Sequence, residues 1–136
     1  MAYALALALL LSGLLWLGFE YFVRVEAEFG PMHHWLQSWW LKAHGVVAMI
    51  ATWGFGVLWT VHIKRFWKQR NNRATGAAMF VLMLILIATG AALYYANGEQ
   101  LRAGVSLLHW LLGLIASAAL IAHVIVGHWS IHTDAG

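Results

Sequence analysis

The chain has 136 residues, of which 62% are hydrophobic and only 10% charged, whereas soluble domains carry about 25% charged residues. This composition excludes an ordinary soluble domain and predicts an integral membrane protein. Because the chain contains no cysteine, disulfides, iron–sulfur clusters and thiolate chemistry are also excluded. The net charge of +3 comes from one short basic segment, so we expect no nucleic-acid partner.

Four stretches are long enough to cross a bilayer as helices, which takes about 20 apolar residues each. They cover residues 2–22, 41–63, 74–95 and 104–126. We therefore predict an all-α, integral membrane four-helix bundle that forms a single domain over residues 1–136. The first stretch lacks the basic start and the cleavage site of a signal peptide, so we expect it to remain as a helix.

The connecting segments predict the orientation. The segment between the second and third helices carries five basic residues and no acid: Lys64, Arg65, Lys68, Arg70 and Arg73. By the positive-inside rule this segment and both termini face the cytoplasm, as expected for a bacterial inner membrane, and the segment is suited to contact anionic lipid headgroups. The connection over residues 23–40 contains three tryptophans, which predict an interfacial segment or, alternatively, a docking surface for a partner.

Four histidines within the apolar stretches are the candidate site residues: His44, His62, His109 and His123. An ionisable residue inside a membrane span indicates function, and neutral imidazole is a common metal ligand. His44 and His62 are 18 residues apart and His109 and His123 are 14 apart, so each pair projects from one face of its helix, with rises of about 27 and 21 Å. Both helices run toward the cytoplasm, which predicts an outer pair, His44 with His109, and an inner pair, His62 with His123.

Other histidines compete less well. His128 lies 19 residues after His109 and is an alternative inner ligand, although it is turned about 100° from the face of His109. His33, His34 and His132 fall in a loop or the tail, where we expect solvated side chains.

Two facing histidine pairs predict two haem groups. Their propionates need cations, and Lys42 with Arg102 are placed for the outer haem, as Lys64 with Arg65 are for the inner one; ordinary snorkelling at helix ends is the alternative. Small residues predict places where a helix or macrocycle approaches closely: Gly54, Gly56, Gly113 and the run Thr89-Gly90-Ala91-Ala92.

Several segments resemble the small four-helix membrane cytochromes b, that is, the cytochrome b561-like group and related short bacterial di-haem b domains. They are Leu41-Lys42-Ala43-His44-Gly45, Thr60-Val61-His62-Ile63, Ala88-Thr89-Gly90-Ala91-Ala92-Leu93-Tyr94-Tyr95, Leu108-His109-Trp110-Leu111-Leu112-Gly113 and Ala122-His123. The resemblance covers about residues 41–128 and implies non-covalent haem b, bis-histidine ligation and electron transfer across the membrane, with a quinol or another cytochrome as partner. In several relatives the partner histidines come from two helices, whereas the first helix here has none.

The expected function is electron transfer by a subunit that links a quinone pool to an external acceptor such as a cytochrome c or a reductase, rather than by a free-standing enzyme. Two alternatives stay open. One is a haem-poor structural anchor of a redox complex. The other is a histidine-based metal or proton transporter, although all five acidic residues lie near the helix ends. A quinol site at the inner edge would draw on His128, Arg65 and Trp67.

Overall fold

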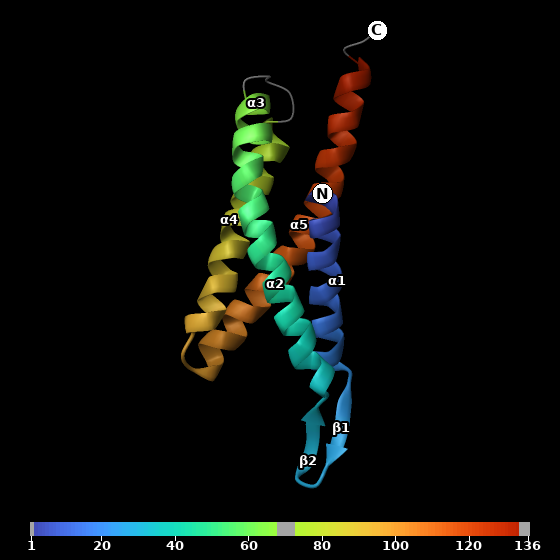
Figure 1. Cartoon of the computed structure of the whole chain (residues 1–136), viewed down its shortest axis with the longest axis vertical. Helices are drawn as coiled ribbons and strands as arrows, with labels where there is room; N and C mark the ends of the chain where they lie inside the picture. Colours follow the sequence, from blue (N-terminus) through green and yellow to red (C-terminus); the bar gives the residue numbers. More distant parts are fainter. Residues whose placement is uncertain (1, 68–72, 134–136) are drawn as a thin grey trace. The chain divides into compact units, whose positions relative to one another are not determined.

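The structure, a computed structural model, describes residues 2–67 and 73–133, without the side chains of residues 66–67 and 128–133. It is almost entirely helical (Figure 1). The helices are α1 (Ala2–Tyr21), α2 (Trp35–Leu58), the π-helix η1 (Trp59–Ile63), α3 (Lys64–Trp67), α4 (Arg73–Tyr95) and α5 (Glu99–Thr133). The all-α class is therefore confirmed.

Four helical stretches are long and apolar enough to span a membrane: Ala2–Tyr21, Trp35–Ile63, Arg73–Tyr95 and Glu99–Gly127. Four spans are thus confirmed, but the predicted boundaries of two helices are wrong. The second helix begins at Trp35 rather than near Leu41, and α5 begins at Glu99 and continues to Thr133. Hydropathy marks only the apolar part of a helix, whereas polar and aromatic residues extend both of these helices beyond it.

The connection between α1 and α2 contains a β-hairpin that the sequence did not predict. Strands β1 (Arg24–Ala27) and β2 (Gly30–His33) pair antiparallel, with Arg24 opposite His33 and Ala27 opposite Gly30. Gly30 has a φ of +110°, which glycine adopts without steric cost, and it follows the two-residue turn. The segment 23–40 is therefore a hairpin followed by the first turns of α2.

The chain divides into two compact units, Met1–Gly56 and Val57–Gly136, called here the N-terminal and C-terminal units. The N-terminal unit contains α1, the hairpin and most of α2. The C-terminal unit is dominated by the antiparallel pair α4 and α5, which run side by side (Figure 1). The prediction of one domain over the whole chain stays a prediction.

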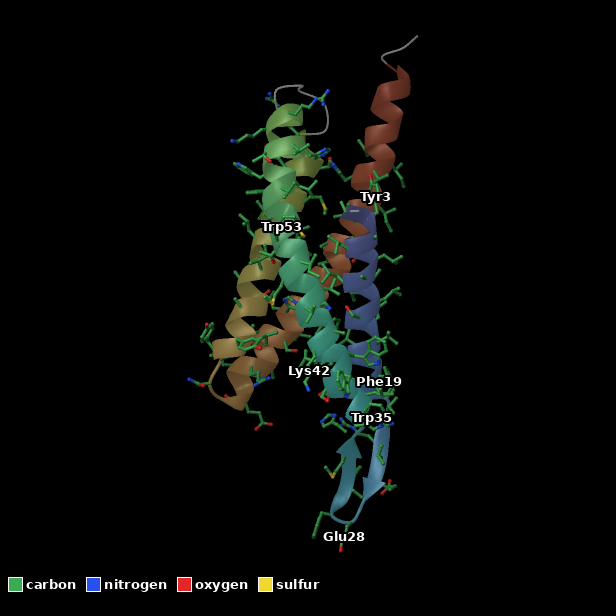
Figure 2. The ribbon with its side chains drawn as sticks, in the orientation of Figure 1. Tyr3, Phe19, Glu28, Trp35, Lys42 and Trp53 are labelled. Carbon is green, nitrogen blue, oxygen red and sulfur yellow. The ribbon has the colours of Figure 1, made fainter. Side chains whose placement is uncertain are left out.

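Apolar side chains cover the surface of the helices. Trp53, for example, is 66% exposed, and aliphatic and aromatic side chains project outward along the helices in Figure 2. Within the described residues only Ser12 and Ala116 are buried. Both are small, as expected where membrane helices approach each other closely. Large apolar surfaces of this kind fit an integral membrane protein, whose helices face lipid.

Candidate functional site

His44 on α2 is held by a hydroxyl from α1. Ser12 Oγ lies 3.0 Å from His44 Nδ1. Ser12 and Ala116 are the two buried residues in the described part of the chain. The Ser12 hydroxyl also donates to the carbonyl of Ala8 at 2.7 Å. Since a hydroxyl has a single proton, the Ser12 oxygen is then an acceptor for the Nδ1–H tautomer of His44. That tautomer has the lone pair of the ring on Nε2.

His109 on α5 has the same arrangement in the C-terminal unit. Thr89 Oγ1 on α4 lies 2.8 Å from His109 Nδ1, and the Thr89 hydroxyl donates to the carbonyl of Ile85 at 2.8 Å. The threonine oxygen is then an acceptor for the Nδ1–H tautomer of His109. Two of the predicted site histidines thus have a hydroxyl partner that favours the same tautomer, on different helices.

His123 is the third histidine that contacts a hydroxyl. Thr75 Oγ1 on α4 lies 2.9 Å from His123 Nδ1. Thr75 and Thr89 are 14 residues apart, the same separation as His109 and His123. Because α4 and α5 are antiparallel, equal separations bring both hydroxyl–histidine contacts into one register.

A glycine follows each of these hydroxyl residues, and each glycine lies against the same imidazole. A Cβ built at Gly13 would lie 3.4 Å from His44 Cε1, at Gly90 3.3 Å from His109 Cε1, and at Gly76 3.8 Å from His123 Cε1. The rings therefore lie over bare backbone. We call Ser12-Gly13, Thr75-Gly76 and Thr89-Gly90 the hydroxyl–glycine pairs.

His62 differs from the other three because it lies in the π-helix η1. Here Lys64 N–H donates to the carbonyl of Trp59, five residues back, so the turn is wider than in an α-helix. The assumption of 3.6 residues per turn from His44 to His62 is therefore wrong. His62 and His123 belong to the same unit, Val57–Gly136.

The predicted cations all lie on the surface. Lys42 (Figure 2) has its Nζ atom 5.1 Å from the centroid of the Trp39 ring, which is a cation–π contact. Arg102, Lys64 and Arg65 are exposed. A Cβ at Gly113 would meet nothing within 4 Å. The side chains of His128 and Trp67, and those of His132, Lys68 and Arg70, lie outside the described residues.

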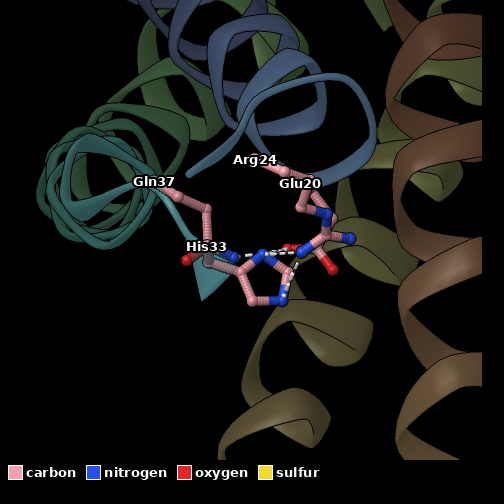
Figure 3. A network of polar contacts seen from close by, with 4 residues as sticks. All are labelled: Glu20, Arg24, His33 and Gln37. Atoms are coloured by element: carbon pink, nitrogen blue, oxygen red, sulfur yellow. Dashed lines mark hydrogen bonds and ion pairs between the residues drawn. The ribbon is translucent and has the colours of Figure 1, made fainter. Parts of the chain in front are cut away.

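Two histidines near the hairpin have structural roles. His33 is exposed, as predicted, but Arg24 Nη1 lies 2.6 Å from Nδ1 and 2.9 Å from Nε2 of its ring, and Glu20 lies 3.5 Å away (Figure 3). His34 is half-buried, so its prediction as a solvated side chain is wrong. Its Nδ1 accepts the Leu36 N–H at 3.1 Å at the start of α2, which is the role of a helix N-cap.

Three tryptophans carry buried indole nitrogens that have no acceptor within the described part of the chain: Trp16, Trp40 and Trp110. A buried donor that lacks a partner costs about 1–3 kcal/mol. Such groups therefore indicate places where a further acceptor belongs.

Ser12 and Thr75 were not predicted from the sequence, although a signal for them exists. Ser/Thr-Gly occurs only three times in the chain, and Ala-Thr-Gly-Ala-Ala occurs twice, at residues 74–78 and 88–92. That repeat matches the spacing of His109 and His123. Only the structure, however, shows that the hydroxyls contact imidazole nitrogens.

Comparison of the chain with models of protein families, with curated proteins and with solved structures found no match. The fold and the site nevertheless define a class. This is a helical membrane protein with four apolar helices, in which three imidazoles are oriented by hydroxyl–glycine pairs on neighbouring helices. Among the described residues no three histidine or acidic side chains gather as a metal-ion site; bis-histidine haem needs two ligands.

Proposed function

We propose that the chain is a di-haem b-type membrane cytochrome that carries electrons across the bilayer. The observation that carries this proposal is the contact of three histidines with hydroxyl–glycine pairs. Metal-ligating histidines usually donate the N–H of the other ring nitrogen to a fixed acceptor, which sets the tautomer and the ring orientation. At His44 and His109 the acceptor holds the proton on Nδ1, so Nε2 is the nitrogen suited to bind iron.

In this proposal His44 and His109 ligate an outer haem, and His62 and His123 ligate an inner one. Bound haem supplies a one-electron carrier that alternates between Fe(II) and Fe(III). Two histidines would hold each haem, so the chain would conduct electrons and would leave no coordination site for a substrate. Lys42 and Arg102 at the outer side, and Lys64 and Arg65 at the inner side, lie on the surface, where they can neutralise carboxylates.

The hydroxyl–glycine pairs have two tasks in this function. The hydroxyl holds each imidazole ring in one orientation and, as a hydrogen-bond acceptor, raises the basicity of the ligand. The glycine allows the ring to lie against the backbone of the next helix, most closely at Gly90, where a Cβ would lie 3.3 Å from His109 Cε1. Together they prepare the ligand before the haem arrives, which reduces the ordering cost of binding.

The proposed setting is the bacterial inner membrane, with the basic segment 64–73 and both termini in the cytoplasm. The chain would act as a subunit between a quinone pool and an external cytochrome c or reductase, in contact with membrane lipid.

The orientation can be tested by labelling single thiols. Because the chain has no cysteine, Glu28→Cys and Lys64→Cys give single thiols. We expect an impermeant maleimide outside intact cells to label the first and not the second; the reverse would contradict the orientation.

Single histidine variants test the ligand assignment. We expect His109→Ala to remove one of two haems per chain, because the imidazole is the iron ligand, and His33→Ala to leave the haem content unchanged as the matched control. The measurement is the pyridine haemochrome assay on purified protein in detergent. An unchanged haem content in His109→Ala would contradict the assignment.

A further inference from the structure

Trp16 and Trp40 carry two of the buried indole nitrogens that lack an acceptor within the described residues. Both belong to the N-terminal unit, Trp16 on α1 and Trp40 on α2. Their positions along the two helices decide what they can bind.

Two contacts between α1 and α2 bracket these tryptophans. Ser12 contacts His44, and nearer the hairpin Gln37 donates to Glu20 (Figure 3). Trp16 is midway between Ser12 and Glu20 on α1, and Trp40 is between Gln37 and His44 on α2. Both therefore lie at one level, about one helical turn from His44 toward the hairpin.

The spacing also places both indoles on the facing sides of the two helices. Trp16 follows Ser12 by four residues, and Trp40 precedes His44 by four, so each shares the face of the residue that makes the contact. A buried N–H without a partner destabilises the structure. Two such donors at one level point to one acceptor group that both can reach.

The protein acceptor nearest in sequence is already engaged. The carboxylate of Glu20, four residues after Trp16, accepts a hydrogen bond from Gln37 and lies 3.5 Å from His33 Nδ1. Lys42, the cation that the sequence predicted for this task, is exposed and contacts the ring of Trp39. No atom in the described part of the chain accepts a hydrogen bond from either indole, which leaves a ligand as the candidate acceptor.

We propose that Trp16 and Trp40 form a carboxylate-binding site one turn from His44, which takes a propionate of the outer haem. This inference rests on the proposed function, since His44 is the ligand of that haem. The two neutral donors bind the carboxylate by direct N–H hydrogen bonds and so fix the rotation of the macrocycle about its axis. Surface cations would neutralise a propionate without fixing that rotation.

The test compares two iron porphyrins on the full-length apoprotein in detergent. Haem b carries two propionates, and iron etioporphyrin has the same macrocycle without carboxylates. Phenylalanine removes the indole N–H and keeps an aromatic ring, so the variants are Trp16→Phe, Trp40→Phe and the double variant. Trp53→Phe is the matched control, because Trp53 on α2 is 66% exposed (Figure 2).

We expect each variant to bind haem b about tenfold more weakly than the wild type, the size expected for a hydrogen bond to a charged group. The double variant should lose about 100-fold, while its affinity for iron etioporphyrin and the affinity of Trp53→Phe for haem b stay unchanged. Equal losses for both porphyrins would mean that the indoles only support the fold, and no loss for either would mean that water or lipid satisfies them. Either result overturns the site. A wild-type chain that binds neither porphyrin would overturn the proposed function, and the site with it.

Discussion

At the scale of single residues, the proton position on the imidazole decides what a histidine can do. Ser12 and Thr89 donate their own protons to the carbonyls of Ala8 and Ile85, so each oxygen is left as an acceptor for Nδ1–H. A methyl group of the same size would fill the space and leave the tautomer unspecified. The function of these residues is therefore chemical as well as steric.

Thr89→Val tests this role, because valine has the shape of threonine without the acceptor. We expect haem affinity to fall about 10- to 100-fold, the usual cost of losing a partner that orients a metal ligand. If ferric haem loses tenfold more affinity than ferrous haem, the midpoint potential rises by about 59 mV. The measurements are haem titration and redox potentiometry.

Two variants serve as controls for the threonine experiment. Thr89→Ser keeps the hydroxyl and should restore haem affinity. Thr52→Val removes the same kind of intrahelical bond, from Thr52 to the carbonyl of Ala48 at 2.8 Å, at an exposed position on α2, and should change nothing. Wild-type affinity and potential in Thr89→Val would show that the hydroxyl has no role in haem binding.

The glycines offer a graded test of the ring position. In Gly90→Ala the new Cβ would lie 3.3 Å from His109 Cε1, whereas in Gly76→Ala the distance to His123 Cε1 would be 3.8 Å, an ordinary van der Waals contact. We expect Gly90→Ala to shift the ring and lower haem occupancy, and Gly76→Ala to retain it. Equal haem content in both variants, measured by the haemochrome assay, would count against the close packing at His109.

At the scale of secondary structure, hydropathy located all four spans but not the start of the second helix or the ends of the fourth. The start of α2 depends on His34, whose ring accepts the Leu36 N–H and contacts Phe19, with ring centroids 5.4 Å apart. Such a cap depends on one side-chain rotamer. The average hydropathy of a stretch of residues contains no information about that rotamer. The hairpin depends on the pairing of Arg24 with His33, a contact between residues that no periodic pattern links.

The π-helix is a second feature that spacing could not predict. A count of 18 residues between His44 and His62 assumes that every turn is α-helical, but Trp59–Ile63 is wider. The 14-residue spacing of His109 and His123 lies within one continuous helix, α5. For this pair the sequence therefore located both residues correctly on one helix, whereas the sequence-based geometry at His62 was wrong.

Substitution of His34 tests whether its ring caps the N-terminus of α2. We expect His34→Ala to lower the free energy of unfolding by about 0.5–2 kcal/mol, the range for loss of an N-cap, and His34→Asn to recover most of it, since asparagine is a preferred cap. Reversible unfolding in mixed micelles, followed by circular dichroism, gives this quantity. Wild-type stability in the alanine variant would show that the ring does not cap the helix.

At the scale of the whole molecule, two helical pairs provide the same histidine environment. In the N-terminal unit a serine from α1 orients His44, and in the C-terminal unit threonines from α4 orient His109 and His123. The absence of histidine from α1 and α4 thus has a physical reason, because these helices supply the partners that orient the ligands. Composition and histidine spacing predicted the membrane class and the candidate ligands, but the partner helices required the structure.

The measurement that tests the proposed function most directly is the number of haem groups per chain. Purified protein in detergent would be assayed by pyridine haemochrome together with a dithionite-reduced minus oxidised spectrum. We expect two b-type haems per polypeptide. Purified, folded protein that contains no haem and takes up none on addition would contradict it.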